Sequence, residues 1–317
     1  MIPRVSIAMA SYNGSKYIVN QLQSFAAQRR LPDEVVVCDD RSTDGTFDLL
    51  QKFQKKAPFE VRLHQNDQNI GYSKNFAKAL SLCSGDVIFI SDQDDFWQPS
   101  KIEFILKVFE NEPKTQLVVN DMVLTDTNLT PTPYTQLGNI LAAGGKADEF
   151  YSGCCMALRR PLLDLATPFP ENFFAHDNWI NHLAVPLGVR SLISKPLQLY
   201  RRHDQNASNW MLSSPTGVSQ FSRARAAGLG SAAEGWKDQI ERYQITLERL
   251  ASRTNVPGAH DDALQNLQFR IKNLDARLTL CAKSRVVRWH LVLALWLRGG
   301  YTDFAGWKSA VKDLIRP

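Results

Sequence analysis

Three carboxylates fall within four positions of the chain, directly after an apolar run. Asp92, Asp94 and Asp95 follow the run from Val87 to Ile90, which has the composition of a buried strand. Carboxylates held this close repel one another and resist transfer out of water, so they require a cation. Oxygen ligands of this kind suit Mg²⁺ or Mn²⁺, which also bind substrate phosphates. The segment therefore predicts a divalent metal that bridges the protein to a diphosphate.

The other predicted strands also end in polar clusters. These clusters span residues 10–14 after the first strand, 39–45 after the second, 66–71 after the third and 91–95 after the fourth. A turn or a helix cap explains any one of them alone. In a parallel sheet, however, the carboxyl ends of the strands meet at one edge, where ligands bind. Together the four clusters predict a ligand site.

The elements that must position these clusters alternate along the first part of the chain. Short β-rich runs at residues 5–9, 35–38, 61–64 and 87–90 are separated by apolar residues at helical spacing. This alternation predicts an α/β fold with a doubly wound, mostly parallel sheet and right-handed crossovers.

The last third of the chain differs in charge and in pattern. Residues 213–317 carry 16 Lys and Arg against nine Asp and Glu, whereas residues 1–212 carry 21 against 23. The polar stretch from Ser213 to Gly217 contains Pro and Gly, which favour a break between structural units. We therefore expect a first domain over residues 1–212 and a helical region over 213–317.

The helical region contains two apolar patterns and a basic tail. Apolar residues recur at spacings of three and four over 229–250 and 264–281, which predicts an αα-hairpin around Pro257-Gly258. The tail, 283–317, mixes arginines and tryptophans with an apolar run. Two interpretations stay open, a further helix packed on the hairpin or an amphipathic segment on an anionic membrane. Its aromatic residues follow helical spacing and form no stacking platform, so nucleic acid is not expected.

The rest of the composition indicates an intracellular location. No apolar run reaches the roughly 20 residues of a spanning helix, and the first residues lack the pattern of a secretory signal. Five cysteines, including the pair Cys154 and Cys155, show no CxxC spacing and favour reduced thiols. We expect a cytoplasmic protein, peripheral on the inner face of the membrane if the tail binds lipid.

Four segments taken together resemble the family 2 inverting glycosyltransferases of GT-A fold. They are 10–13 (ASYN), 39–46 (DDRSTDGT), 69–71 (NIG) and 92–95 (DQDD), and the resemblance is close over residues 1–110 and looser to residue 210. It implies that Tyr12 and Asp40 contact the nucleotide base with Asp39 nearby. It also implies that Asp92-Gln93-Asp94 is the DXD motif, in which Asp94 is the principal metal ligand.

The same resemblance assigns the other site residues. The nucleotide-binding set is Ser11, Tyr12, Asn13, Asp39, Asp40, Asn69, Gly71, Lys74 and Asp92. The metal set, for Mg²⁺ or Mn²⁺, is Asp94, Asp92 and His203. The donor and acceptor set is Gln93, Asp95, Gly153, His176, Trp179, Arg201 and Arg202.

Two downstream segments and two departures complete the comparison. Residues 151–158 resemble an acceptor-side strand whose glycine lies beside the sugar, and residues 200–203 (YRRH) resemble the segment that closes the catalytic domain. Ala10 stands where many relatives carry Ser or Thr, and Gln93 stands where a small residue is common. These departures remove no ligand, but they weaken any inference about the donor.

An inverting displacement also needs a base that takes the proton of the acceptor hydroxyl. Asp177 stands at the start of the apparently helical segment 179–184, and on the residues alone a capping role explains it. The resemblance favours the catalytic role, because this family carries its base in such a segment. The form His176-Asp177-x-Trp179 looks like bacterial rhamnosyltransferases of the family. Asp121 and Glu171 are the next candidates for the base.

The expected function is metal-dependent transfer of a sugar from a nucleotide-diphosphate donor to a hydroxyl of a bacterial surface glycan or lipid-linked glycan, such as O-antigen. L-Rhamnose from dTDP-rhamnose is the leading donor, by resemblance alone. A sugar nucleotidyltransferase is one alternative, but it would be expected to carry a glycine-rich basic loop where the chain has residues 11–15, SYNGS. A non-catalytic carbohydrate-binding protein is another, against which Asp92, Asp94 and Asp177 count. The acceptor, the linkage and the oligomeric state stay open.

Overall fold

The computed structural model describes residues 2–171, 173, 175–204, 232–302 and 304–315. The chain divides into two compact units, Met1–Gly217 and Val218–Pro317. The domain boundary expected between residues 212 and 213 lies outside the described residues.

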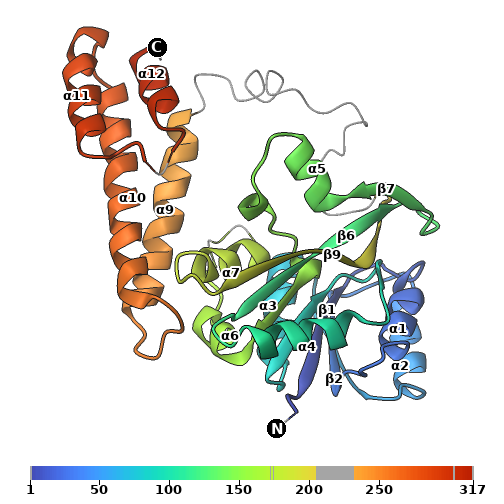
Figure 1. Ribbon diagram of the computed structural model, residues 1–317. Helices are drawn as coiled ribbons and strands as arrows, with labels where there is room; N and C mark the ends of the chain where they lie inside the picture. The colour runs from blue at the N-terminus through green and yellow to red at the C-terminus, as the bar shows by residue number, and fades with distance from the viewer. Residues whose placement is uncertain (1, 172, 174, 205–231, 303, 316–317) are drawn as a thin grey trace. The chain divides into compact units, whose positions relative to one another are not determined.

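The described strands of the first unit form one nine-stranded sheet (Figure 1). They are β1 (Val5–Ser11), β2 (Glu34–Asp39), β3 (Glu60–Gln65), β4 (Val87–Ser91), β5 (Phe96–Trp97), β6 (Leu117–Thr125), β7 (Pro131–Thr135), β8 (Met156–Arg159) and β9 (Arg190–Arg201). The order across the sheet is β3-β2-β1-β4-β8-β6-β9-β5, and β7 pairs with β6. The strands β1 to β4 run parallel to one another, and β6 runs parallel to β9, whereas β8 is antiparallel to β4 and β6. The expected α/β fold with a mostly parallel sheet is confirmed.

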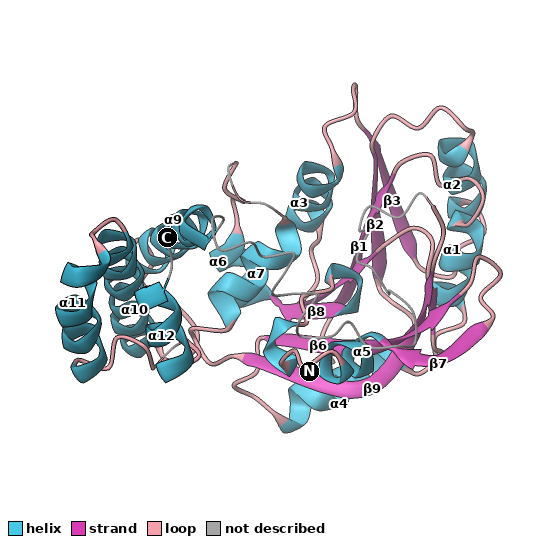
Figure 2. Ribbon diagram, turned by 90° about the horizontal axis from the view of Figure 1, so that it is seen from above, coloured by secondary structure: helices cyan, strands magenta, loops and turns pink. Residues whose placement is uncertain are grey.

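Helices cover both faces of the parallel part of the sheet (Figure 2). One face carries α1 (Ile18–Ala26), α2 (Thr46–Gln54) and α4 (Lys101–Asn111), and the other carries α3 (Tyr72–Leu82). The remaining elements of this unit are α5 (Gln136–Ala142), η1 (Ala147–Glu149), η2 (Gly153–Cys155), α6 (Arg160–Ala166) and α7 (His176–Ala184). The strand expected over 151–158 begins only at Met156, because Gly153 lies in the 3-10 helix η2.

Burial on both faces explains the apolar strands. Side chains alternate across a strand, so Val5, Ile7 and Met9 share one core cluster with Ile18 and Phe25 of α1. Every residue of β2 and β4 is buried, as in parallel sheets covered by helices on both sides. This packing brings the carboxyl ends of β1, β2, β3 and β4 to one edge of the sheet.

Glu34 is a buried carboxylate at the opposite end of the sheet. Its side chain is 1% exposed, accepts from the Ser84 backbone N–H at 2.6 Å and lies 3.1 Å from Arg62 Nη1. Burial by itself raises the pKa of Glu34, but hydrogen bonds from Ser6, Ser84 and Arg62 outweigh it and lower this pKa to about 2.

Acid should therefore destabilise the native protein partly through Glu34. Because its folded pKa lies below the unfolded value of 4.5, its contribution is present above pH 4.5 and is lost as the pH falls toward 2. Between pH 4.5 and 2, the Glu34→Gln protein should lose about 3 kcal/mol less unfolding free energy than the native protein. Urea unfolding at several pH values measures this difference. Glu110→Gln, at an exposed position of α4, is the control. An unchanged acid slope in Glu34→Gln would contradict this assignment.

The second unit is helical, as expected for the C-terminal region. It contains α9 (Ala232–Ala251), α10 (His260–Cys281), α11 (Arg285–Leu297) and α12 (Trp307–Ile315) (Figure 1). The helices α9 and α10 pack as a hairpin; residue 229, where its apolar pattern was expected to begin, lies outside the described residues. Among the described residues no helix is long and apolar enough to cross a membrane.

The tail packs on the hairpin through a buried ion pair. Arg277 of α10 is 3% exposed and donates to both carboxylate oxygens of Asp313 in α12, at 2.7 and 3.1 Å. Its guanidinium also lies 4.2 Å from the ring centroid of Trp236 in α9. Part of the tail therefore forms helices packed on the hairpin.

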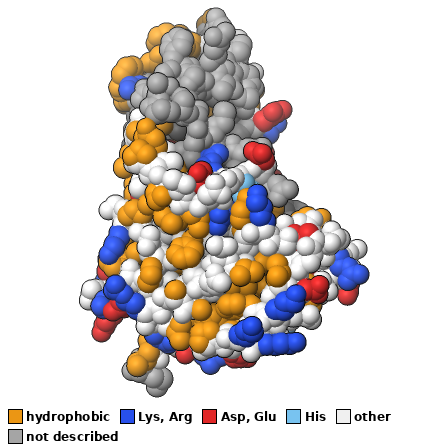
Figure 3. All heavy atoms as spheres, turned by 90° about the vertical axis from the view of Figure 1, so that its right-hand side faces the viewer, with side chains coloured by type: hydrophobic (Ala, Val, Ile, Leu, Met, Phe, Trp, Pro, Cys, Tyr) orange, Lys and Arg blue, Asp and Glu red, His pale blue; other side chains and the backbone are white. Residues whose placement is uncertain are grey.

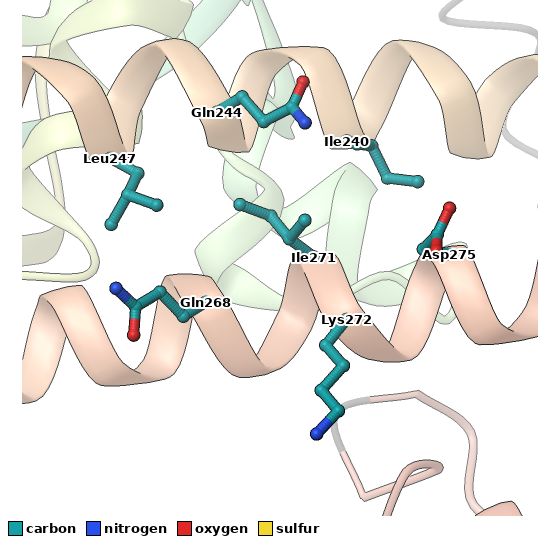
Figure 4. Close-up of a pocket in the computed structure, with 7 residues that line it drawn as sticks. All are labelled: Ile240, Gln244, Leu247, Gln268, Ile271, Lys272 and Asp275. Carbon is teal, nitrogen blue, oxygen red and sulfur yellow. The ribbon is translucent and has the colours of Figure 1, made fainter.

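The surfaces of the two units carry different features. On the face of the first unit shown in Figure 3, acidic and basic side chains are interspersed between apolar ones. In the second unit, the seam between α9 and α10 contains a hollow (Figure 4). It is lined by Ile240, Gln244, Leu247, Gln268, Ile271, Lys272 and Asp275. Because only one carboxylate and one cation line it, this hollow offers no metal-ligand cluster.

Candidate active site

Gln93 joins the loop after β1 to the acidic loop after β4. Its side chain donates to the Tyr12 carbonyl oxygen at 3.0 Å and accepts from the Tyr12 N–H at 2.9 Å. A Cβ atom on Gly14 would come within 2.1 Å of Gln93 Oε1. Gln93, which stands where a small residue is common, therefore fixes the Tyr12 loop, and in this position its side chain fills the space beside Gly14. The Tyr12 residue itself is 47% exposed, so its ring remains open to a ligand.

Asp39 and Asp40 hold the neighbouring loops. Asp39 is fully buried and accepts from Ser11 Oγ at 3.0 Å. Asp40 accepts from the backbone N–H groups of Ile70 at 2.8 Å and Gly71 at 2.9 Å. Gly71 has a φ of 85°, a left-handed conformation that favours glycine. The two carboxylates therefore shape the rim of the site, and their contact with a nucleotide stays a prediction.

The other predicted nucleotide-binding residues border the same loops. Asn13 Oδ1 accepts from the Thr43 N–H at 2.9 Å, which links the loops after β1 and β2. Asn69 Oδ1 accepts from the Gly71 N–H at 3.0 Å, and Lys74 is exposed near the start of α3. The structure thus gathers all the residues of this set at one edge of the sheet.

The carboxylates after β4 form a cluster with a cysteine that the sequence did not indicate. Asp92, Asp95 and Cys154 each offer a ligand atom, and these atoms lie within 4.8 Å of one another. Burial first, and then the charge of Asp94, raise the pKa of Asp92 to about 7 and that of Asp95 well above its usual range. The carboxylates therefore carry a desolvation and repulsion cost that a divalent cation would relieve.

Asp94 lies beside this cluster and pairs with His203. The distance from Asp94 Oδ2 to His203 Nε2 is 2.8 Å. The His203 ring stacks on the Tyr17 ring with centroids 4.9 Å apart. The Arg201 guanidinium lies 4.4 Å from the centroid of the Tyr17 ring. Arg201 is 4% exposed and donates through Nε to the Asp94 carbonyl oxygen at 2.7 Å. The end of β9 is thereby attached to the acidic loop, and two of the three predicted metal ligands are in contact.

Lys101 and Gln198 support the acidic cluster from behind, and the sequence analysis missed both. Lys101 is fully buried, donates through Nζ to the Cys154 carbonyl oxygen at 3.1 Å and also donates to Gln198 Oε1. The Gln198 amide in turn donates to Asp95 Oδ2 at 3.1 Å. Burial lowers the pKa of Lys101 to about 8, and the nearby cysteines and Asp95 oppose this shift. The lysine therefore places a buried cation near the carboxylates, and through Gln198 it links Asp95 to the Cys154 backbone.

Replacing this buried cation should weaken metal binding. We expect Lys101→Met to retain the fold but to bind Mn²⁺, in the presence of a nucleoside diphosphate, about 10- to 100-fold more weakly, because Gln198 and Asp95 lose their orientation. Calorimetric titration measures this change. Lys107→Met is the matched control, because Lys107 lies on the same helix with 65% of its side chain exposed. Native-like Mn²⁺ affinity in a folded Lys101→Met protein would show that the lysine only stabilises the fold.

Asp177 lies in the first turn of α7 and is not its N-cap residue, which is Ala175. Its Oδ1 accepts from the Asn178 N–H at 2.7 Å, whereas Oδ2 has no hydrogen-bond partner in the part of the chain that the structure describes. After burial and the charge of Asp94, the charge of Asp177 also contributes to the raised pKa of Asp92. Asp177 therefore lies near enough to Asp92 for the two charges to interact.

Gly153 packs directly against the first turn of α7. A Cβ atom on Gly153 would come within 2.7 Å of His176 Nε2 and 3.3 Å of Asp177 Cβ. The His176 ring is buried and stacks on Phe76 with centroids 4.1 Å apart. Within the described residues neither of its ring nitrogens has a hydrogen-bond partner. Burial lowers the pKa of His176, so a neutral imidazole with two unused nitrogens lies beside Asp177.

Trp179 is enclosed in the core, whereas the assignment of Arg202 to the donor or acceptor stays a prediction. Trp179 is 0% exposed, and its Nε1 donates to the Ala166 carbonyl oxygen at 2.8 Å. Its assignment as a sugar contact is therefore corrected, because the indole is enclosed in the core and fixes α7 against α6. The backbone N–H of Arg202 donates to the Thr125 carbonyl oxygen at 3.3 Å, which places this residue just after β9.

A comparison with protein families decides the class of this site. The model described as Glycosyl transferase family 2 matches residues 6–165, just over half of the chain. The chain belongs to glycosyl transferase family 2. It is accordingly an enzyme that transfers a sugar from a nucleotide-sugar donor, and the matched residues contain the polar strand ends, the acidic cluster and Gly153.

Curated relatives of this family 2 chain extend beyond the matched residues. An uncharacterized glycosyltransferase from Nostoc sp. is 25% identical over 279 residues, which cover 84% of this chain and 81% of the relative. A dTDP-rhamnosyl transferase from Shigella flexneri is 27% identical over 217 residues, which cover 62% of this chain and 72% of the relative.

Two solved structures with nucleotide-sugars bound share this fold. TarS 1-349 from S. aureus in complex with UDP-GlcNAc matches with a TM-score of 0.56 and 19% identity, over 86% of this chain and 72% of that chain. The mannosyltransferase PcManGT from Pyrobaculum calidifontis in complex with GDP-Man and Mn²⁺ matches with a TM-score of 0.52 and 17% identity, over 99% and 87%. These similarities confirm the GT-A fold.

Proposed function

We propose that this enzyme is an inverting, metal-dependent glycosyltransferase in which Asp177 is the catalytic base. The arrangement of Asp177 carries the proposal. One oxygen of this carboxylate has no hydrogen-bond partner among the described residues. The carboxylate lies separate from the acidic loop in sequence and influences Asp92 through its charge. A base for the acceptor and a separate acidic site for the donor are what a single displacement requires.

The chain's own residues account for the positions of the two substrates. The nucleotide would bind at the rim formed by the loops of Tyr12, Asp40 and Gly71, with its diphosphate toward the acidic loop. Asp177 would accept the proton of the acceptor hydroxyl as that oxygen bonds to the anomeric carbon. The bond from this carbon to the diphosphate breaks on the opposite side, so the configuration inverts. His176 is neutral, and its ring, with both nitrogens buried, packs on Phe76 and against Gly153, so it would position Asp177 rather than contact the sugar.

The acidic loop fits Mg²⁺ or Mn²⁺. Asp92, Asp94 and Asp95 provide the hard oxygen donors that these ions prefer, and His203 lies within reach of Asp94. Cys154 fits less well, because its hydrogen bond with Cys155 and its burial raise its pKa and keep the thiol protonated. When bound, the ion would neutralise the negative charge of the departing diphosphate.

We propose dTDP-rhamnose as the first donor to test. Support comes from the dTDP-rhamnosyl transferase relative and from the form His176-Asp177-x-Trp179. The acceptor would be a hydroxyl of a bacterial surface glycan or a lipid-linked glycan, as proposed from the family resemblance.

A donor panel tests this proposal. The protein would be incubated with dTDP-rhamnose, UDP-GlcNAc or GDP-mannose, each with Mn²⁺, with Mg²⁺ and with EDTA, and release of the nucleoside diphosphate would be measured. We expect release from one donor, dependent on the metal. Water takes the place of the acceptor in this assay, so NMR should show an inverted anomeric configuration in the sugar that is first released. Release without metal, or retention of configuration, would overturn the proposed mechanism. Release from UDP-GlcNAc or GDP-mannose alone would replace the proposed donor. The panel also tests the non-catalytic alternative, which predicts binding without release.

A further inference from the structure

The segment formed by α11 and α12 exposes an unusual amount of apolar surface. Of the 18 large hydrophobic residues that are exposed among the described residues, ten lie between positions 286 and 315. The exposed tryptophans of the described chain, Trp289, Trp296 and Trp307, all belong to this set, with exposures of 65%, 42% and 61%. Single exposed apolar residues are ordinary, but a concentration of this kind marks an interaction site.

Two separate apolar stripes run along α11. One stripe packs on the hairpin through Val292, which is 5% exposed, and Leu295, which lies against the core cluster of this unit. The other stripe consists of Val286, Trp289, Leu293 and Leu297, with exposures of 82%, 65%, 57% and 76%. Their spacings of three, four and four place them on one helical face. Folding of the unit therefore uses one apolar face of α11 and leaves the other exposed.

The charges beside the exposed stripe are basic. In α12, Trp307 and Val311 are exposed at a spacing of four, and Lys308 and Lys312 follow them in sequence and are also exposed. Among the described residues of 283–315 the one carboxylate is Asp313, which is buried and paired with Arg277. The exposed ionised side chains of this segment, Lys283, Arg298, Lys308 and Lys312, are therefore cations.

We propose that the exposed face of α11 and α12 binds an anionic lipid surface. Apolar side chains including tryptophans, together with lysine and arginine, are what a helix lying in a lipid interface presents. The charge favours phospholipid headgroups over a neutral apolar partner, because among the described residues of this segment the cations have no exposed carboxylate beside them. The 13 residues of α11 are too few to span a bilayer, so the helix lies along the surface. This attachment goes beyond the proposed sugar transfer and does not depend on it.

Vesicle co-sedimentation of the full chain tests the proposal. The vesicles would contain equal parts of phosphatidylglycerol and phosphatidylcholine, with pure phosphatidylcholine as the comparison. We expect binding to the anionic vesicles that falls as salt is raised. The double variant Trp289→Ser and Leu293→Ser should bind about tenfold more weakly, as should Lys308→Glu with Lys312→Glu. These side chains are exposed, so both variants should keep the native melting temperature.

Phe269→Ser is the matched control, because Phe269 is an exposed apolar residue of the same unit, 39% exposed on α10. It should bind vesicles as the native chain does. Native protein that ignores anionic vesicles at low salt would overturn the proposal, as would full binding by the Trp289 and Leu293 variant. Sedimentation equilibrium tests whether a second copy of the chain binds this face instead of lipid. A native dimer that dissociates in that variant, without vesicle binding, would identify the face as a contact between copies of the chain.

Discussion

An Asp177→Asn protein is expected to fold and bind the nucleotide-sugar as the native chain does, with turnover lower by about 10² to 10⁴-fold. Asparagine has nearly the size of aspartate and can still accept the hydrogen bond from the Asn178 N–H. Its amide cannot take the proton of the acceptor hydroxyl, so only the chemical step should suffer. Initial transfer rates and calorimetric donor affinity, measured on the same preparation, separate the two effects.

A control variant and a contrary result complete the test of Asp177. Asp164→Asn in α6 makes the same chemical change at a side chain that is 64% exposed, and should transfer at the native rate. Near-normal transfer by a folded Asp177→Asn protein would reject Asp177 as the base. Asp121 is then a poor replacement, because its Oδ1 already accepts from the N–H groups of Met122 and Leu137. Glu171, which is exposed, would be the carboxylate to examine.

The parallel half of the fold could be predicted because its signals are local. Strands buried on both faces appear as short apolar runs, and the helices between them carry one apolar face. The other half of the sheet depends on pairings between distant segments. The strand β5 has two residues, and both pair with β9, Phe96 with Leu199 and Trp97 with Gln198. No local pattern in the sequence encodes such a pairing.

The candidate site shows the same division. The loops that hold Tyr12, Asp40 and Gly71 follow predicted strands, so their approach could be deduced from the topology. Lys101 could not be found in this way, because a lysine in an amphipathic helix is normally exposed and its partners Cys154 and Gln198 lie 53 and 97 positions away.

Helical periodicity predicts which residues share a face but not what that face contacts. The position of Trp179 two residues after Asp177 suggested a sugar contact, yet the turn of α7 directs the indole to the Ala166 carbonyl oxygen. In the tail, 283–317, the mixture of arginines, tryptophans and apolar residues left packing and membrane binding as alternatives. The structure shows that α11 has one apolar face packed on the hairpin and a second one exposed. The two interpretations therefore concern different faces of one helix.

A divalent metal is also expected to have a large effect, because it should tighten nucleotide binding. We expect a nucleoside diphosphate to bind at least about tenfold more tightly with Mn²⁺ than with EDTA, and Asp94→Asn to remove most of this gain. Burial leaves the carboxylates of Asp92 and Asp95 with raised pKa values, and a cation relieves the repulsion that contributes to them. Calorimetric titration of the nucleotide into native and variant protein, with and without Mn²⁺, measures the gain directly.

The melting temperature separates a structural role of Asp94 from a role in metal binding. Asparagine at position 94 can still bond His203, so the attachment of β9 to the acidic loop should persist in the variant. Its melting temperature without metal should therefore stay close to that of the native chain. Asp261→Asn, at a side chain that is 93% exposed, is the control for losing one negative charge and should keep the full Mn²⁺ effect. Equal nucleotide affinity with EDTA and with Mn²⁺ in the native protein would exclude a metal bridge. The acidic loop would then hold His203 and Arg201 in place without a cation.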